Sequence, residues 1–251
     1  MKSLDVLFTP ADFAALKNRN LNDTLCVVFD VFRATSSMVT ALANAAEAII
    51  PVAEIPEALA LKQKSPDVLL AGERDGVRIR AAQTGGIDFD LGNSPREFTK
   101  EKVAGKTIVM TTTNGTRALR SCAHAQTVLI SSFLNLKATA DFVLRASPEN
   151  LLLICSGTYE ETAYEDALGA GALCDALWNH LAQSKISDSA KMARELHTAV
   201  RHDVATAAST SRNGTRLLGI PDLRPDVLFC MQRDLFNFSA AMQKDGKIQK
   251  L

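Results

Sequence analysis

The amino-acid sequence predicts an α/β fold, with a predominantly parallel or mixed sheet, helices on both faces and a helical C-terminal region. Strand-length apolar runs alternate with segments of helical spacing over residues 4–181, as in chains built from βαβ units. Residues 25–29 and 151–155 are apolar at every position, which is typical of strands covered on both faces. We therefore expect one compact domain over residues 1–251, and its similar strand–loop–helix segments suggest an internal pseudo-repeat.

Each expected element has a local reason. Pro10 follows the first strand and favours the first turn of a helix, residues 34–46 are rich in alanine, and Pro51 and Pro56 bound the next strand. Strands are expected at residues 4–8, 25–29, 48–52, 68–71, 107–110, 127–131 and 151–155. Helices are expected from residue 9 and at residues 34–46, 57–64, 115–123, 136–146, 165–181, 189–204, 204–211 and 227–236. Residues 72–95 are expected to be irregular.

Composition excludes several classes of function. Lysine plus arginine and aspartate plus glutamate both number 28, so no net basic field attracts nucleic acid. No apolar run has the length of a membrane span or a signal peptide, and the five cysteines form no C-x-x-C pair, so we expect a cytoplasmic protein with reduced thiols. Phosphate-loop and dinucleotide motifs are missing, and the four histidines are scattered. We expect a small-molecule partner, no nucleic acid and no membrane, and leave a homo-oligomer open.

One polar segment between an expected strand and an expected helix predicts an anion site. It consists of Thr111, Thr112, Thr113, Asn114, Gly115 and Thr116. Hydroxyl groups, a glycine that lets the backbone approach a ligand, and the positive end of a helix together suit a phosphate. The alternative is an ordinary strand–helix turn capped by Thr113 or Asn114.

A second polar loop places Asp30 at the end of a buried strand, followed by Arg33 and Thr35. A carboxylate in that position is a candidate metal ligand or nucleophile. The planar fork of Arg33 suits a phosphate, and Asp30, Arg33 and Asn114 are the candidate catalytic residues. The alternative is an Asp30–Arg33 ion pair at the start of the helix.

Further carboxylates predict a hard-oxygen metal site. Glu73 follows a strand as Asp30 does, and Glu165 and Asp166 stand at the start of a small-residue helix. We expect Mg²⁺ to be held by Asp30, Glu73 and Asp166, with Glu165 as an alternative to Asp166. Acidic residues in a first helical turn can also be simple capping. Candidate substrate-binding residues outside the threonine-rich segment are Arg33, Thr35, Arg74, Asn93 and Ser94.

Taken together, these motifs resemble the 2-phosphosulfolactate phosphatase (ComB) family in identity and order. The resemblance rests on residues 30–35, 72–74, 91–95, 111–116 and 165–166, and on C-terminal residues that include Ser211, Gly214, Leu217 and Asp226. It departs from the family at Ser36 and Ser37, where threonines are more usual, and at residues 234–240.

The resemblance implies a Mg²⁺-dependent phosphatase acting on the phosphate ester of a 2-hydroxy acid, with sulfolactate as the product in coenzyme M biosynthesis. In that setting Arg74 or Arg117 would bind the carboxylate or sulfonate of the substrate. The sequence leaves open whether water or Asp30 attacks phosphorus. It also leaves open a broader phosphatase active on phosphoglycolate or phospholactate, and a non-catalytic domain that binds phosphorylated hydroxy acids.

Overall fold

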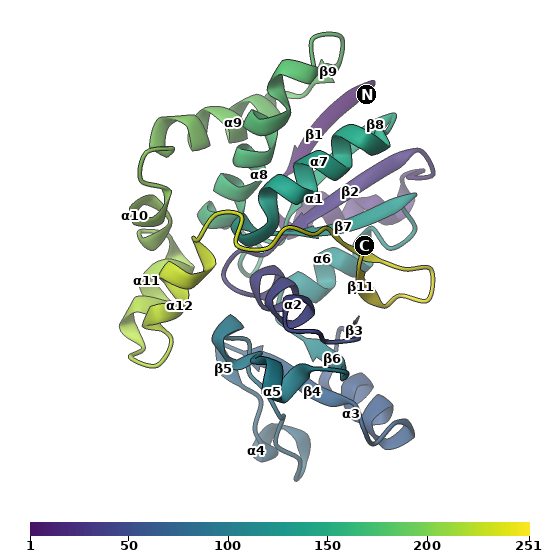
Figure 1. Ribbon diagram of the computed structural model, residues 1–251, viewed down its shortest axis with the longest axis vertical. Coiled ribbons are helices and arrows are strands. Elements are labelled where there is room, and N and C mark those ends of the chain that lie inside the picture. Colours follow the sequence, from purple (N-terminus) through teal and green to yellow (C-terminus); the bar gives the residue numbers. More distant parts are fainter.

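Eleven strands form one mixed sheet in the computed structural model, which describes residues 1–251 (Figure 1). Their order across the sheet is β5-β4-β6-β3-β11-β10-β7-β2-β8-β1-β9. The strands are β1 Ser3–Leu7, β2 Thr24–Phe29, β3 Ala48–Pro51, β4 Leu69–Arg74, β5 Val77–Arg78, β6 Thr107–Thr111, β7 Thr127–Ser131, β8 Asn150–Cys155, β9 Lys185–Ile186, β10 Ala240–Met242 and β11 Ile248–Lys250. The predicted α/β class is confirmed.

Twelve α-helices and four short 3₁₀ helices connect these strands. The α-helices are α1 Pro10–Ala14, α2 Ala34–Ala43, α3 Ile55–Lys64, α4 Ala81–Thr84, α5 Lys100–Val103, α6 Gly115–Ser121, α7 Leu136–Ala146, α8 Tyr164–Leu177, α9 Asp188–Val200, α10 Val204–Ser209, α11 Arg212–Gly219 and α12 Arg224–Cys230. The 3₁₀ helices are η1 Ala15–Asn18, η2 Pro95–Glu97, η3 Phe133–Asn135 and η4 Trp178–His180. No helix is long and apolar enough to cross a membrane.

The sheet consists of two parallel groups of strands joined by an antiparallel hairpin. Strands β4, β6 and β3 form one group, and β7, β2, β8 and β1 form the main part of the other. The β10–β11 hairpin lies between β3 and β7 and pairs antiparallel with both. The two groups therefore run in opposite directions, and Figure 1 shows α2 and α6 between them.

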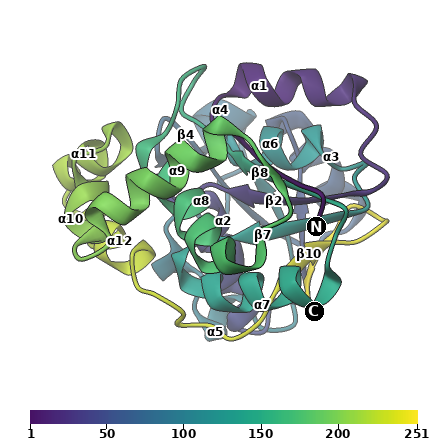
Figure 2. The same ribbon diagram turned by 90° about the horizontal axis from the view of Figure 1, so that it is seen from above.

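The central strands are buried on both faces, as their continuous apolar runs predict. On β2, the side chains of Leu25, Val27 and Phe29 join one hydrophobic core, whereas those of Cys26 and Val28 join another. Alternate side chains of a strand point to opposite faces, so this division follows from the strand geometry. Figure 2 shows α1 and α6 on one side of these strands and α7 and α8 on the other. The helices therefore sandwich the sheet.

Several predicted boundaries are wrong. Residues 72–95 are only partly irregular, because β4 continues to Arg74 and β5 and α4 follow it. The helix expected at residues 227–236 is α12, which ends at Cys230, and the helix expected at residues 189–204 ends at Val200. Strands β10 and β11 were not predicted, since three-residue strands carry too short a pattern to recognise. They form because β3 and β7 offer unpaired edges.

Candidate active site

A polar cleft lies where the ends of β2, β4, β6 and β8 meet helix α11. Its volume is about 60 Å³, room for about four waters at roughly 10–15 Å³ each, which is close to the size of a phosphoryl group. The polar loops that follow β2, β6 and β8 converge on this one site, although β6 belongs to the oppositely directed group of strands. The cleft is lined by Asp30, Phe32, Arg33, Glu73, Asp75, Gly76, Asn93, Thr113, Asn114, Gly157, Thr158, Tyr159, Asn213, Arg216 and Leu217.

Asp30 is the buried carboxylate of this cleft. It follows β2 directly, its Oδ1 accepts a hydrogen bond from the Ala34 backbone N–H at 3.0 Å, and the residue is 8% exposed. A Cβ atom on Gly115 would stand 2.5 Å from Asp30 Oδ2. Glycine is therefore required at position 115 because the carboxylate approaches the start of α6 so closely.

Burial also changes the acidity of Asp30. Loss of hydration, together with the negative charges of Glu73 and Glu165, raises its pKa to about 6 against the opposing hydrogen bonds from Ala34 and Ser156. A carboxyl group of this kind exchanges its proton near neutral pH. A metal ion that binds Asp30 would therefore displace this proton.

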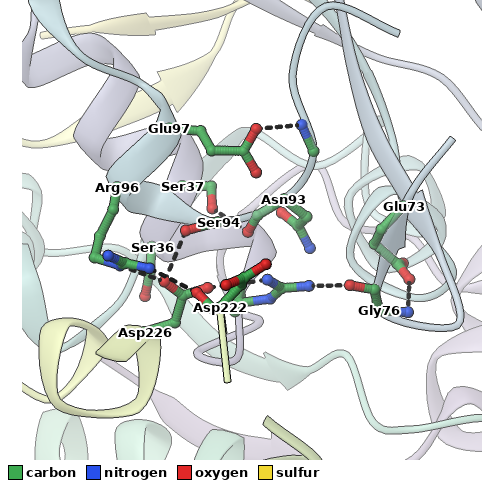
Figure 3. A network of polar contacts seen from close by, with 12 residues as sticks. Ser36, Ser37, Glu73, Gly76, Asn93, Ser94, Arg96, Glu97, Asp222 and Asp226 are labelled. Carbon is green, nitrogen blue, oxygen red and sulfur yellow. Dashed lines mark hydrogen bonds and ion pairs between the residues drawn. The ribbon is translucent and has the colours of Figure 1, made fainter. Parts of the chain in front are cut away.

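Glu73 is the second carboxylate of the cleft, and it holds two loops. Its Oε1 accepts hydrogen bonds from the backbone N–H and the hydroxyl of Thr113, at 2.8 and 2.9 Å. Its Oε2 accepts the Gly76 N–H at 2.7 Å, which closes the turn between β4 and β5 (Figure 3). Thr113 therefore belongs to the site through Glu73.

Two asparagine side chains add oxygen atoms that nothing in the chain satisfies. The Oδ1 atoms of Asn93 and Asn114 are buried and accept no hydrogen bond, and both residues line the cleft. Asn93 is positioned by Ser37 of α2, whose hydroxyl donates to the backbone carbonyl oxygen of Asn93 at 2.8 Å. Buried amide oxygens normally have a partner, so these two are candidate ligand-binding atoms. Together with Asp30 and Glu73 they form a set of hard oxygens.

The threonine-rich segment is not the open anion cradle that the sequence suggests. Thr111 donates its hydroxyl proton to the Ala53 carbonyl and accepts a hydrogen bond from Arg74, at 3.0 and 3.1 Å. Thr112 and Thr116 bond to each other across the first turn of α6. These contacts occupy three of the hydroxyls within the fold, so only Thr113, Asn114 and Gly115 meet the cleft or its carboxylate.

Arg33 lies in the cleft wall but does not pair with Asp30. Its Nη1 donates to Asp226 at 2.9 Å and its Nη2 donates to the Gly76 carbonyl at 2.7 Å, with the side chain 3% exposed. Arg33 therefore forms its ion pair with Asp226, 193 residues away, and not with Asp30 as the sequence alternative suggested. Two of the five guanidinium N–H groups are used, which leaves three for a substrate oxygen.

Asp226 of α12 is the anchor of this arginine. Its Oδ1 accepts hydrogen bonds from the Ser94 hydroxyl at 2.7 Å and from Arg96 Nε at 2.9 Å (Figure 3). Asp226 is fully buried. Ser94 is thus an anchor contact rather than a cleft residue. This carboxylate ties α12 to Arg33 and to the segment that carries Ser94 and Arg96.

Three other predicted residues also serve the fold. Asp166 accepts hydrogen bonds from the Val31 and Gly157 N–H groups and from Ser156, at 2.8, 3.2 and 2.9 Å, and it does not line the cleft. Thr35 bonds to the backbone of Asp30, and Arg74 bonds to Thr111 and to the Glu73 carbonyl. Their assignment to metal or substrate stays a prediction, and these contacts do not support it.

Glu165 and Asp166 are both buried beside Asp30. Burial raises the pKa of each carboxyl, and their mutual repulsion adds to the effect at Asp166. Glu165 Oε1 accepts a hydrogen bond from Asn213 at 2.5 Å, while its Oε2 has no partner. Glu165 is therefore the one of the pair that faces α11.

Sequence reasoning missed the contribution of α11 and of Tyr159 in the loop after β8. Asn213, Arg216 and Tyr159 line the cleft, whereas Arg117 forms an exposed ion pair with Glu160. The only signal for α11 lay in Ser211, Gly214 and Leu217, which fit the family resemblance without suggesting a role for their neighbours.

Comparison with known proteins gives a consistent picture. The model of the 2-phosphosulpholactate phosphatase family matches residues 12–245. A probable 2-phosphosulfolactate phosphatase of Thermotoga petrophila is 40% identical over 210 residues, which is 84% of this chain and 85% of that protein. One from Pseudothermotoga lettingae is 36% identical over 248 residues, or 98% and 99% of the two chains. One from Caldicellulosiruptor saccharolyticus is 36% identical over 218 residues, or 85% and 87%.

Proposed function

Because the chain belongs to the 2-phosphosulfolactate phosphatase family, we propose that it hydrolyses the phosphate ester of a 2-hydroxy acid at this cleft, with Mg²⁺ as cofactor. The corresponding reaction is 2-phosphosulfolactate plus water to sulfolactate plus phosphate. The observation that carries the proposal is the pairing of two buried carboxylates, Asp30 and Glu73, with two unsatisfied amide oxygens in one cleft.

The residues present fit a magnesium ion. Mg²⁺ prefers oxygen ligands, is usually bound by one or two carboxylates, and completes its coordination with water and substrate phosphate. Asp30 and Glu73 supply the carboxylates, and the free Oδ1 atoms of Asn93 and Asn114 supply further acceptors for the ion or its waters. No group of three acidic, histidine or cysteine side chains is arranged to hold a metal ion. When bound, the ion would neutralise charge on the phosphoryl oxygens.

The protein's own groups then position the ester. Phosphoryl transfer depends mainly on alignment and on stabilisation of the charge on the three equatorial oxygens. The three unused N–H groups of Arg33 would bind these oxygens, and Asp226 would keep the guanidinium in place. The Nδ2 group of Asn114 would donate to a phosphoryl oxygen when its Oδ1 faces the metal side. The P–O bond to the alcohol breaks as the attacking oxygen bonds to phosphorus, and the alcohol oxygen leaves with a proton.

The direct test is hydrolysis of phosphorylated 2-hydroxy acids. We expect release of phosphate from 2-phosphosulfolactate in the presence of Mg²⁺, and loss of that activity in excess EDTA with recovery when Mg²⁺ is added back. A panel containing 2-phospholactate and phosphoglycolate measures how broad the activity is. Saturable binding of these esters without phosphate release would show instead a non-catalytic binding protein.

The raised pKa of Asp30 predicts how metal binding depends on pH. Below about pH 6 Asp30 is protonated in the metal-free protein, and Mg²⁺ must displace that proton to bind. We expect the apparent Mg²⁺ affinity, measured by isothermal titration calorimetry, to fall about tenfold per pH unit below pH 6 and to level off above it. Equal affinities at pH 5 and pH 7.5 would contradict a metal ligand at Asp30.

A further inference from the structure

The outer part of the cleft carries an arginine without an ion-pair partner, and the Asp75 carboxylate that also lines the cleft accepts a hydrogen bond from the Tyr159 hydroxyl at 3.4 Å. Arg216, an exposed residue of α11, donates from Nη2 to the backbone carbonyl of Asp75 and from Nη1 to the Tyr159 hydroxyl at 3.5 Å. Neither partner is charged in that contact, and Arg216 forms no ion pair. The other arginine of the cleft, Arg33, is buried and shares the carboxylate of Asp226 with Arg96. Arg216 is therefore the exposed arginine of the cleft that has no carboxylate partner.

The helix that carries Arg216 is fixed against the site. Asn213, one turn earlier on α11, donates to Thr158 Oγ1 at 2.7 Å and to Glu165 Oε1 at 2.5 Å. A Cβ atom on Gly214 would stand 2.4 Å from the Ala208 carbonyl oxygen, so α11 packs closely on the end of α10. Arg216 is thus an exposed guanidinium on an anchored helix that faces the cleft.

The two ends of the cleft differ in depth and in charge. Asp30 and Glu73 are buried and suit the metal and the phosphoryl group, whereas Arg216 is exposed at the outer side. A phosphorylated hydroxy acid carries a second acidic group on the carbon skeleton that extends from the phosphate. An ester whose phosphoryl group lies at the carboxylates can therefore present that second group to Arg216.

Resting on the proposed phosphatase function, we propose that Arg216 is a specificity-determining residue that binds the carboxylate or sulfonate which the substrate carries besides its phosphate. Guanidinium groups bind such planar or multi-oxygen anions through parallel N–H groups, which an ammonium group cannot reproduce. The candidates from sequence are less suited, because neither Arg74 nor Arg117 lines the cleft, and Arg117 is paired with Glu160.

The test compares four small phosphate esters that carry different acidic groups besides the phosphate. They are 2-phosphosulfolactate with both groups, 2-phospholactate with a carboxylate, 2-sulfoethyl phosphate with a sulfonate, and isopropyl phosphate with neither. For each acidic ester, kcat/KM is divided by kcat/KM for isopropyl phosphate. We expect Arg216→Gln to lower this ratio about tenfold, as for loss of a hydrogen bond to a charged group, and Arg216→Lys to restore it only in part. The ester whose ratio falls identifies the group bound.

The matched control is Arg212→Gln. Arg212 lies on the same helix and is exposed, but it pairs with Glu161 and does not line the cleft. Its ratios should equal those of the wild type. Unchanged ratios in Arg216→Gln for every acidic ester would overturn the specificity role, while the phosphatase function would stand.

A binding measurement keeps the two proposals separate. Titration of 2-phospholactate, 2-sulfoethyl phosphate and isopropyl phosphate into the Mg²⁺-loaded protein measures binding directly for any ester that is not hydrolysed. We expect Arg216→Gln to weaken binding of at least one acidic ester about tenfold relative to isopropyl phosphate. If the wild type hydrolyses no ester, the proposed function fails, and this titration still decides the role of Arg216: equal weakening of all three esters would contradict it.

Discussion

Replacement of Asp30 by asparagine is expected to abolish phosphatase activity while making the metal-free protein more stable. Activity should fall more than a hundredfold, because the metal's stabilisation of the transition state amounts to several kcal/mol and asparagine lacks the charge to hold the ion. The same loss follows if Asp30 attacks phosphorus. The amide oxygen of asparagine can still accept the Ala34 N–H, so the fold should remain intact.

The gain in stability follows from the direction of the pKa shift. Burial raises the pKa of Asp30 from 3.8 to about 6, so between these values the folded protein binds a proton that the unfolded chain releases. The stability contributed by the protonated group is complete below about pH 4 and is lost as the pH rises through 6. Asparagine avoids that loss, which amounts to roughly 2–3 kcal/mol at pH 7.5 at 1.36 kcal/mol per pKa unit.

Urea unfolding in EDTA, at pH 7.5 and at pH 4, measures this effect. The free energy of unfolding of Asp30→Asn should exceed that of the wild type at pH 7.5 and should be nearly equal to it at pH 4. Asp67→Asn, a change at an exposed residue without side-chain contacts, serves as the control and should be neutral. If Asp30→Asn keeps the wild-type kcat/KM in limiting Mg²⁺, Asp30 neither binds the metal nor takes part in catalysis.

Replacement of Asp226 by asparagine is expected to destabilise the protein by about 3–5 kcal/mol, which is the cost of leaving one member of a buried ion pair unpaired. Asp226 is fully buried, and its Oδ2 is 2.9 Å from Arg33 Nη1. Asparagine replaces one of the two carboxylate oxygens by an NH2 group, which would face the donors that Asp226 now satisfies. It also carries no negative charge to compensate that of Arg33. Since domains are stable by only about 5–15 kcal/mol, urea unfolding should show the loss clearly.

Two comparisons make this prediction specific. Arg96→Gln removes the partly exposed partner of Asp226 and should cost only about 0–1 kcal/mol, and Asp141→Asn breaks an exposed helix pair with Lys137 at a similarly small cost. Turnover of Asp226→Asn at a temperature where it is still folded should also fall, because Arg33 loses its anchor. A destabilisation no larger than that of Arg96→Gln would show that Asp226 is not the anchor.

The features of this protein that the sequence predicts are those that depend on residues close together along the chain. The apolar run of β2 and the polar residues that follow it determine a two-sided strand that ends in Asp30, and the same logic placed Glu73, Thr113 and Asn114 at the cleft. Strand periodicity and strand-end polarity are local properties, so they can be read along the chain. Side-chain chemistry likewise predicted that oxygen ligands would gather at one site.

The sequence by itself therefore determined the α/β class, the family and the main carboxylates, while the tertiary structure decided which side chains are free to act. Arg33 meets Asp226 across 193 residues, the threonine hydroxyls are used by Ala53, by Glu73 and by the first turn of α6, and Arg216 reaches the cleft because α11 docks on the β8 loop. Each of these outcomes depends on packing between distant elements, and a hydrogen-bond donor satisfied by one partner is no longer available to a ligand. Local sequence patterns do not show which partner a donor will bind in the folded protein.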